Sequence, residues 1–306
     1  MKFLHLLMLI FSALKLLSTM FILMSGKLRT RITKRLSGYK NGIWITPAAI
    51  WLLYIFLSVV DWNWDPRIFI KLVFYFSIPT LILQYAERTK RLLGVPDILA
   101  ILSLWLPFDF RLMNDSWPVL GEFKYHTSAT IAVIYTFITF CGFRRIDINA
   151  SWKLSRNDAF NVLLFFVGVS AILVPLGYSF HFLEIGLSDL FQKAAWMVPL
   201  YFVTIFIGAA LPEELLFRGV IQNVLTKRMS FAPALITTSV IFGLAHINNG
   251  VRLGEHLFQP PNWTYVLMAT IAGLFYGGIF HKQRSLLSAM LLHTLVDFTW
   301  VMFLRG

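Results

Sequence analysis

Long apolar runs, separated by short polar segments, extend over the whole chain. Apolar and polar positions do not alternate within these runs, so the pattern predicts helices and argues against the strands of a β-barrel. A helix needs about 20 apolar residues to cross a bilayer, and most runs are close to that length. We therefore predict an all-α, multi-pass transmembrane helical bundle of about eight to ten spans. The candidate spans are residues 3–24, 43–60, 68–84, 94–107, 127–143, 159–178, 194–211, 231–246, 263–280 and 285–304.

The composition favours the same class of protein. Of 306 residues, 58% are hydrophobic and 14% are charged, whereas soluble domains are about half apolar and about a quarter charged. The single cysteine, Cys141, excludes an internal disulfide framework and a cysteine-based metal cluster. Residues 3–24 begin like a signal peptide, but Lys15 interrupts the run and no small-residue cleavage site follows. We expect this segment to be retained as a membrane anchor.

The net charge of +12 reflects basic residues in the polar segments between spans. A basic soluble protein would suggest a nucleic-acid partner, but here one set of alternate loops holds 18 Lys and Arg residues and the opposite side holds 6. Such a bias places the richer set in the cytoplasm. We therefore expect a lipid bilayer and no nucleic acid as partner. The location that we expect is a bacterial cytoplasmic (inner) membrane. The cytoplasmic set comprises residues 25–42, 85–93, 144–158, 212–230 and 281–284.

Three short motifs place ionisable groups inside the apolar runs of the last third of the chain. A charge at the bilayer centre costs roughly 2.5–3.5 kcal/mol on insertion scales, so such groups are usually paired and functional. The motifs are "EELLFR" at 213–218, "FGLAH" at 242–246 and "HTLVD" at 293–297.

Helical spacing separates the roles of these ionisable groups. Glu214 and Arg218 stand four residues apart with the acid first, which favours an ion pair on one helix face. Glu213 lies about 100° around the helix and has no such partner in its own segment. His293 and Asp297 also share a face, so Asp297 can orient the imidazole. One glutamate is therefore expected to be neutralised and the other to be free for chemistry.

Depth along the helices is compatible with a meeting of the three motifs. At a rise of about 1.5 Å per residue, the motif residues lie roughly 14–24 Å from the cytoplasmic ends of their spans. The first motif then makes residues 194–226 too long for one upright span. We expect a helix that is either tilted and protruding or bent at Pro212.

A glutamate and a histidine at one intramembrane site can together activate a water molecule. Glu213 would act as general base, and a second histidine would donate a hydrogen bond to the oxyanion of a tetrahedral intermediate. This chemistry hydrolyses a peptide bond without a covalent nucleophile. The H-E-x-x-H, G-x-S-x-G and G-x-G-D signatures of other protease classes do not occur in the sequence.

In order and spacing, the three motifs resemble those of the CPBP family, the CAAX protease and bacteriocin-processing family of intramembrane proteases. The family pattern is E-E-x-x-x-R, then F-x-x-x-H, then H-x-x-x-N or a variant. The resemblance covers roughly residues 155–306 and implies a protease core in 151–306, with 1–150 as an N-terminal transmembrane module of unassigned role. It implies water activation by Glu213 and His246, support and substrate positioning by Glu214 and Arg218, and oxyanion-hole positions for His293 and Asp297.

Asp297 is the departure from the family pattern, because the prenyl protease has asparagine there. An ionised aspartate cannot donate to an oxyanion. Three roles stay open for it: a protonated donor, an orienting partner of His293, or a ligand that helps to hold a cation. Histidines and carboxylates can bind zinc, so zinc stays open, although we expect no required metal or other cofactor.

The expected substrate is a membrane-anchored protein or peptide, including a lipidated or C-terminally anchored one. A proton-coupled transporter that uses the buried Glu and His groups as a relay is an alternative, although the sequence shows no inverted repeat. A second alternative is a protease-like scaffold that binds a partner, as in bacteriocin immunity.

Overall fold

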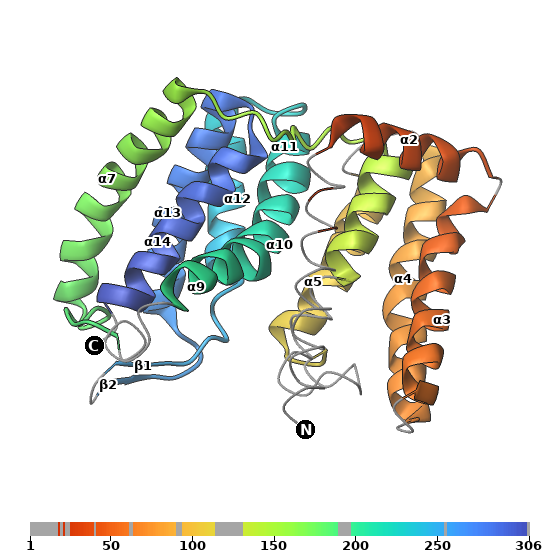
Figure 1. Ribbon diagram of the computed structural model, residues 1–306, viewed down its shortest axis with the longest axis horizontal. Coiled ribbons are helices and arrows are strands. Elements are labelled where there is room, and N and C mark those ends of the chain that lie inside the picture. The colour runs from red at the N-terminus through yellow and green to blue at the C-terminus, as the bar shows by residue number, and fades with distance from the viewer. Residues whose placement is uncertain are drawn as a thin grey trace. The chain divides into compact units, whose positions relative to one another are not determined.

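The structure, a computed structural model, is 78% helical and almost free of strands. It describes residues 18, 21, 25–39, 41–60, 64–89, 94–113, 131–188, 197–253 and 256–304. The chain divides into two compact units, Met1–Asp147 and Ile148–Gly306 (Figure 1).

The first unit is built from apolar helices, of which α4 packs against both α3 and α5. Many of the large apolar side chains on α3 and α4 are exposed, as expected for surfaces that face lipid. The helices are α2 (Gly26–Ser37), the 3₁₀-helix η1 (Gly42–Trp44), α3 (Ile45–Val60), α4 (Pro66–Thr89), α5 (Val95–Asp109) and the π-helical segment η3 (Phe137–Phe143).

A buried ion pair joins three helices of this unit. Arg144, directly after η3, donates from Nε and Nη2 to the two carboxylate oxygens of Asp97 on α5, at 2.7 and 2.8 Å. Its Nη1 donates to the carbonyl oxygen of Ala86 on α4 at 2.8 Å. Both charged side chains are 4% exposed. Bidentate geometry of this kind best offsets the cost of removing two charges from water. We therefore infer that this ion pair holds the three helices together.

The second unit contains the three motifs. Its helix α7 is capped by Ser155, whose Oγ accepts from the backbone N–H of Asp158 at 3.1 Å. The elements are α7 (Arg156–Ser179), α9 (Val198–Ile205), η5 (Phe206–Ala210), α10 (Leu211–Glu214), η6 (Leu215–Gln222), α11 (Asn223–Leu225), α12 (Phe231–Leu244), the antiparallel strands β1 (Val251–Leu253) and β2 (His256–Phe258), α13 (Trp263–Gln283) and α14 (Leu286–Phe303).

The helix that carries the first motif is longer than the sequence pattern predicted. The hydropathy prediction of a span ending at 211 and a loop over 212–230 is wrong, because one helical run of 28 residues covers Val198–Leu225, as expected from the depth of the first motif in residues 194–226. The apolar pattern stops at the ionisable residues, but the second unit buries and pairs Glu214 and Arg218, so the helix continues. Arg218, counted above as a loop charge, is 0% exposed.

This long helix changes direction between α9 and α11 (Figure 1). Pro212 lies inside this run, in the first turn of α10, and a proline in a helix interior removes one backbone hydrogen bond. The residues before it, Ala210 and Leu211, keep right-handed helical backbone angles. Irregular π-helical turns lie on both sides, in η5 and η6, and such turns are a common source of bending. The helix therefore continues through Pro212 and does not break there.

The fold class predicted from the sequence is confirmed. Five described helices are long and apolar enough to cross a membrane, and three shorter apolar helices accompany them, so the protein is an all-α, multi-pass integral membrane protein. The predicted span 3–24 lies outside the described residues, apart from 18 and 21. The five long helices are Pro66–Glu87, Arg156–Ser179, Val198–Leu225, Trp263–Gln283 and Leu286–Phe303, and the shorter ones are Gly42–Phe56, Ile131–Phe143 and Phe231–Leu244.

Two glycines on α13 allow the long helix and α12 to approach it closely. The Gly273 carbonyl oxygen accepts from Arg218 Nη2 at 3.2 Å, and the Gly277 carbonyl oxygen accepts from Gln222 Nε2 at 2.8 Å. A methyl group added at Gly277 would collide with the side chains of Gln222 and Leu235. Small residues at this spacing are typical of close helix contacts in membranes.

We expect Gly277→Val to lower the free energy of unfolding by about 1–3 kcal/mol, because the added side chain overpacks this contact. The measurement is chemical denaturation of the purified full-length protein in detergent. Gly26→Val is the matched control, since nothing lies within 4 Å of a methyl group at Gly26. Equal stability of both variants would contradict the packing role of Gly277.

Candidate active site

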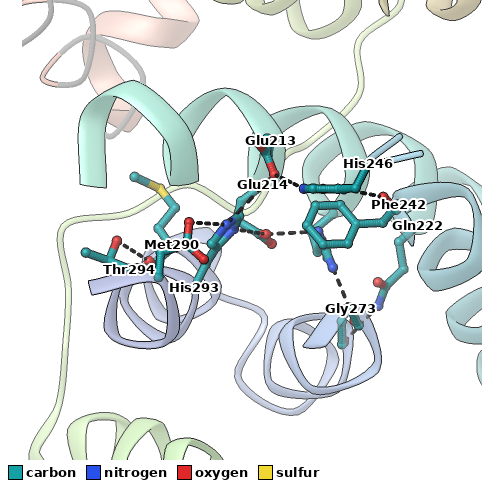
Figure 2. Close-up of polar contacts among 12 residues, drawn as sticks. Glu213, Glu214, Gln222, Phe242, His246, Gly273, Met290, His293 and Thr294 are labelled. Atoms are coloured by element: carbon teal, nitrogen blue, oxygen red, sulfur yellow. Dashed lines mark hydrogen bonds and ion pairs between the residues drawn. The ribbon is translucent and has the colours of Figure 1, made fainter. Parts of the chain in front are cut away.

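The three motifs come together inside the second unit, as Figure 2 shows. Glu213 and Glu214 lie on α10 and Arg218 on η6, one turn further along the same helix. The other members come from the end of α12 and from the middle of α14. Residues separated by about 80 positions therefore meet at one place. The residues predicted for the site are Glu213, Glu214, Arg218, His246, His293 and Asp297.

Glu214 is the structural centre of the cluster. Its Oε1 accepts from Arg218 Nη1 at 2.8 Å, which is the ion pair predicted from spacing. The same oxygen lies 2.8 Å from His293 Nδ1. A carboxylate can only accept, so Nδ1 of His293 carries the proton. Glu214 and Arg218 are 0% exposed and His293 is 4% exposed, so one oxygen fixes two buried side chains.

The guanidinium of Arg218 is enclosed by rings. Its Cζ lies 4.4 Å from the ring centroid of Phe242 and 5.3 Å from that of Tyr276. Aromatic faces attract cations, and the attraction is strongest where water is excluded. Together with Glu214 and the Gly273 carbonyl oxygen, these rings stabilise a charge that would otherwise be unfavourable in a membrane.

Glu213 is placed differently from its neighbour. Its Oε2 lies 3.9 Å from His246 Nε2 and 3.8 Å from His293 Nε2. These separations are too long for direct hydrogen bonds, but a bridging water would fit the spacing. Within the described part of the chain, Oε2 has no hydrogen-bond partner. The arrangement leaves a carboxylate oxygen and two imidazole nitrogens around one position.

The tautomer of His246 is determined by the backbone. Its Nδ1 lies 2.8 Å from the carbonyl oxygen of Phe242, and a carbonyl oxygen can only accept. Nδ1 therefore carries a proton, and Nε2 of the neutral ring presents its lone pair toward Glu213. The ring is also packed against Phe242 and Tyr265, with centroid distances of 4.9 and 4.8 Å.

Asp297 lies beside the second histidine. Its Oδ2 is 3.3 Å from His293 Nε2, one helical turn away on α14. His293 is therefore held by Glu214 at one nitrogen and faces Asp297 at the other. This contact favours the orienting role among those considered for Asp297, whereas its place in an oxyanion hole stays a prediction.

Tyr276 is a site residue that the sequence analysis missed. Its ring stacks on His293, with a centroid distance of 4.6 Å and an angle of 14° between the planes. In the sequence it lies within "GLFYGG", which indicates close helix packing. The sequence pattern that could have indicated Tyr276 is a large aromatic residue between two packing glycines. Such a residue projects toward the helices that pack closely against those glycines.

A cavity of about 250 Å³ adjoins the site. Glu213, His246, His293 and Asp297 line it together with apolar side chains, many of them from α7 and α13. Glu213 and Asp297 are each 33% exposed, whereas Glu214 is closed off. The cavity is therefore the space in which a substrate would meet the unpaired carboxylate.

Among the described residues, no group of three or more His, Cys, Asp or Glu side chains has an arrangement that could hold a metal ion. The expectation that no metal is required stays a prediction, and we assign no step to one.

The protein has a multi-pass helical membrane fold, with carboxylates and histidines gathered at an internal cavity. Proteins with this combination include intramembrane proteases. Residues 195–299 match the family described as type II CAAX prenyl endopeptidase Rce1-like. This match, which contains all three motifs, confirms the resemblance to the CPBP family of intramembrane proteases. Comparisons with curated proteins and with solved structures gave no match.

Proposed function

We propose that this protein is an intramembrane endopeptidase in which Glu213 and His246 activate the attacking water. The observation that carries the proposal is the convergence of Glu213 Oε2 with the Nε2 atoms of His246 and His293, at 3.9 and 3.8 Å. This convergence lies on the cavity and inside a helical membrane bundle. Water activation by a positioned carboxylate is general base catalysis.

The first step begins with a water molecule between Glu213 and His246. The Nε2 lone pair of His246 accepts one water proton in a hydrogen bond and so orients the molecule. Glu213 removes the other proton as the oxygen attacks the carbonyl carbon of the scissile peptide bond. The carbonyl oxygen becomes an oxyanion. His293 in its imidazolium form, with Nδ1 donating to Glu214, can direct its Nε2 proton toward this oxyanion.

The second step breaks the bond between carbon and nitrogen. Glu213 returns its proton to the leaving nitrogen as the tetrahedral intermediate collapses, giving a carboxylic acid and an amine. Glu214 and Arg218 support the reaction indirectly, since the shared Glu214 oxygen holds His293 in place. Asp297 acts on the other nitrogen of the same ring.

We further propose that the substrate is a membrane-anchored protein or peptide, either lipidated or anchored at its C-terminal end, and that no metal is required. The family match supports a bilayer context and a membrane-associated substrate. We also propose a bacterial cytoplasmic membrane as the location. The distribution of Lys and Arg between alternate loops supports the orientation of the chain in that membrane.

The test compares the C-terminal ends of membrane proteins in cells that contain the wild-type protein or the His246→Ala variant. We expect a set of new C-terminal ends with the wild type that is lost in the variant, because the attacking water is no longer oriented. His281→Ala is the matched control: His281 stacks on Phe231, outside the cavity. The same ends in both variants would contradict the mechanism, and transport without proteolysis would favour a carrier.

A further inference from the structure

Two carboxylates and two imidazoles line the candidate cavity. Among the described residues that line it, the charged ones are Glu213 and Asp297, and there is no Lys or Arg. The guanidinium of Arg218 does not line the cavity and is engaged by Glu214 and by the Gly273 carbonyl oxygen. The two cavity carboxylates are therefore not neutralised by Arg218.

Counting the charges of the whole cluster gives the same result. Three carboxylates face one guanidinium and two imidazoles, and Nε2 of His246 is free to accept while its Nδ1 proton is held by a carbonyl. With His293 protonated, His246 neutral and the three carboxylates ionised, the cluster keeps one negative charge. An unpaired charge is unfavourable at low dielectric, and a cation supplied from outside would remove the deficit.

An aromatic wall in the same cavity is the second observation. It consists of Phe182, Tyr265 and Trp300, whose ring centroids lie 5.4 to 6.0 Å apart. Trp300 is three residues after Asp297 on α14, so the two side chains share a helix face. The faces of aromatic rings attract ammonium and guanidinium groups. The cavity thus combines a partly exposed carboxylate with a wall suited to a cation and its apolar stem.

We propose that Asp297 and this aromatic wall select substrates that carry an ammonium or guanidinium group next to the scissile bond. Glu213 Oε2 and Asp297 Oδ2 lie at most about 7 Å apart, since they are 3.8 and 3.3 Å from the same Nε2 of His293. Successive Cα atoms are about 3.8 Å apart and a Lys or Arg side chain adds its own length, so the cation belongs to a residue within a few positions of the bond that is cut. The inference rests on the proposed function and assigns to Asp297 the role of cation ligand.

Two sources can supply this cation: the side chain of a Lys or Arg residue, or a free N-terminal amine. The cleavage test uses the full-length protein in lipid nanodiscs and a library of membrane-anchored peptides. In each set one Lys is kept, acetylated at Nζ or replaced by norleucine, and the N-terminus is free or acetylated. We expect kcat/KM to be at least tenfold higher for the cationic member of a set, and the set that shows it identifies the source.

The ratio of kcat/KM for the Lys peptide over the norleucine peptide, measured with one enzyme variant, separates cation binding by Asp297 from a purely catalytic role of this residue. Asp297→Asn is expected to bring the ratio of kcat/KM for Lys over norleucine close to one, whatever its effect on the absolute rate. Asp297→Glu, which keeps the charge, is expected to retain a preference. An equal ratio in wild type and Asp297→Asn would overturn the inference while leaving the proposed function intact.

A binding test needs no catalysis. We expect n-decylamine to raise the unfolding temperature of the wild-type protein in nanodiscs more than n-decanol does. This difference should disappear in Asp297→Asn and shrink in Trp300→Leu, while the control Asp158→Asn keeps it, because Asp158 caps α7 through Ser155, outside the cavity. Amine selectivity without any cleavage would refute the proposed protease but support the cation site. No selectivity would refute the site.

Discussion

Glu213→Gln is expected to lower kcat/KM for peptide cleavage by about 10²–10⁴-fold, the usual contribution of a general base. The amide has nearly the shape of the carboxylate but cannot accept the proton of the attacking water. Stability should change little, because Glu213 Oε2 has no hydrogen-bond partner in the described part of the chain. The measurement is cleavage of a peptide identified by the proteomic comparison, together with thermal unfolding of both proteins.

The matched control for this prediction is Glu184→Gln. Glu184 is exposed and does not line the cavity, so its loss removes the same charge from elsewhere in the second unit. We expect wild-type kcat/KM for this variant. Full activity of Glu213→Gln would show that Glu213 is not the general base. The resemblance of the three motifs to the family pattern would then no longer support catalysis by this residue.

Arg218→Met is expected to destabilise the protein by about 3–5 kcal/mol, the usual effect of removing one partner of a buried ion pair. Methionine is apolar and cannot donate to the Glu214 oxygen that accepts from Nη1 at 2.8 Å. A buried carboxylate is then left with His293 alone. Chemical denaturation in detergent measures the effect.

Two further variants show whether the effect arises from the charge. Arg228→Met removes an exposed cation beyond α11, and surface changes of this kind are usually within about 0.5 kcal/mol of wild type. The double variant Glu214→Gln with Arg218→Met leaves no unpaired carboxylate at this position, so we expect it to recover part of the lost stability. A double variant less stable than Arg218→Met would contradict this account of the pair.

The partners of Glu214 show which contacts a local sequence pattern can predict and which it cannot. Spacing on one helix predicted the pair of Glu214 and Arg218, because residues four apart share a face in any α-helix. Spacing could not show that the same Glu214 oxygen also holds His293, which lies 79 residues away. That contact depends on how α10 and α14 pack.

The error over residues 212–230 has a similar origin. A hydropathy pattern treats an ionisable residue as exposed to water, so it ends the predicted span 194–211 just before Glu213. The second unit instead surrounds Arg218 with Glu214, a backbone carbonyl and aromatic rings. A buried charge with such partners allows the helix to continue to Leu225, and only the packing of neighbouring helices supplies those partners.

The sequence by itself determined the class of protein, the order of the apolar helices and the three motifs, because these depend on composition and on the helical period. The tertiary structure alone decided that Tyr276 stacks on His293 and that the Glu214 oxygen that pairs with Arg218 also holds His293. It also decided that Asp297 shares a cavity with an aromatic wall. These features are contacts between helices, and their geometry is set by packing, which no local pattern encodes.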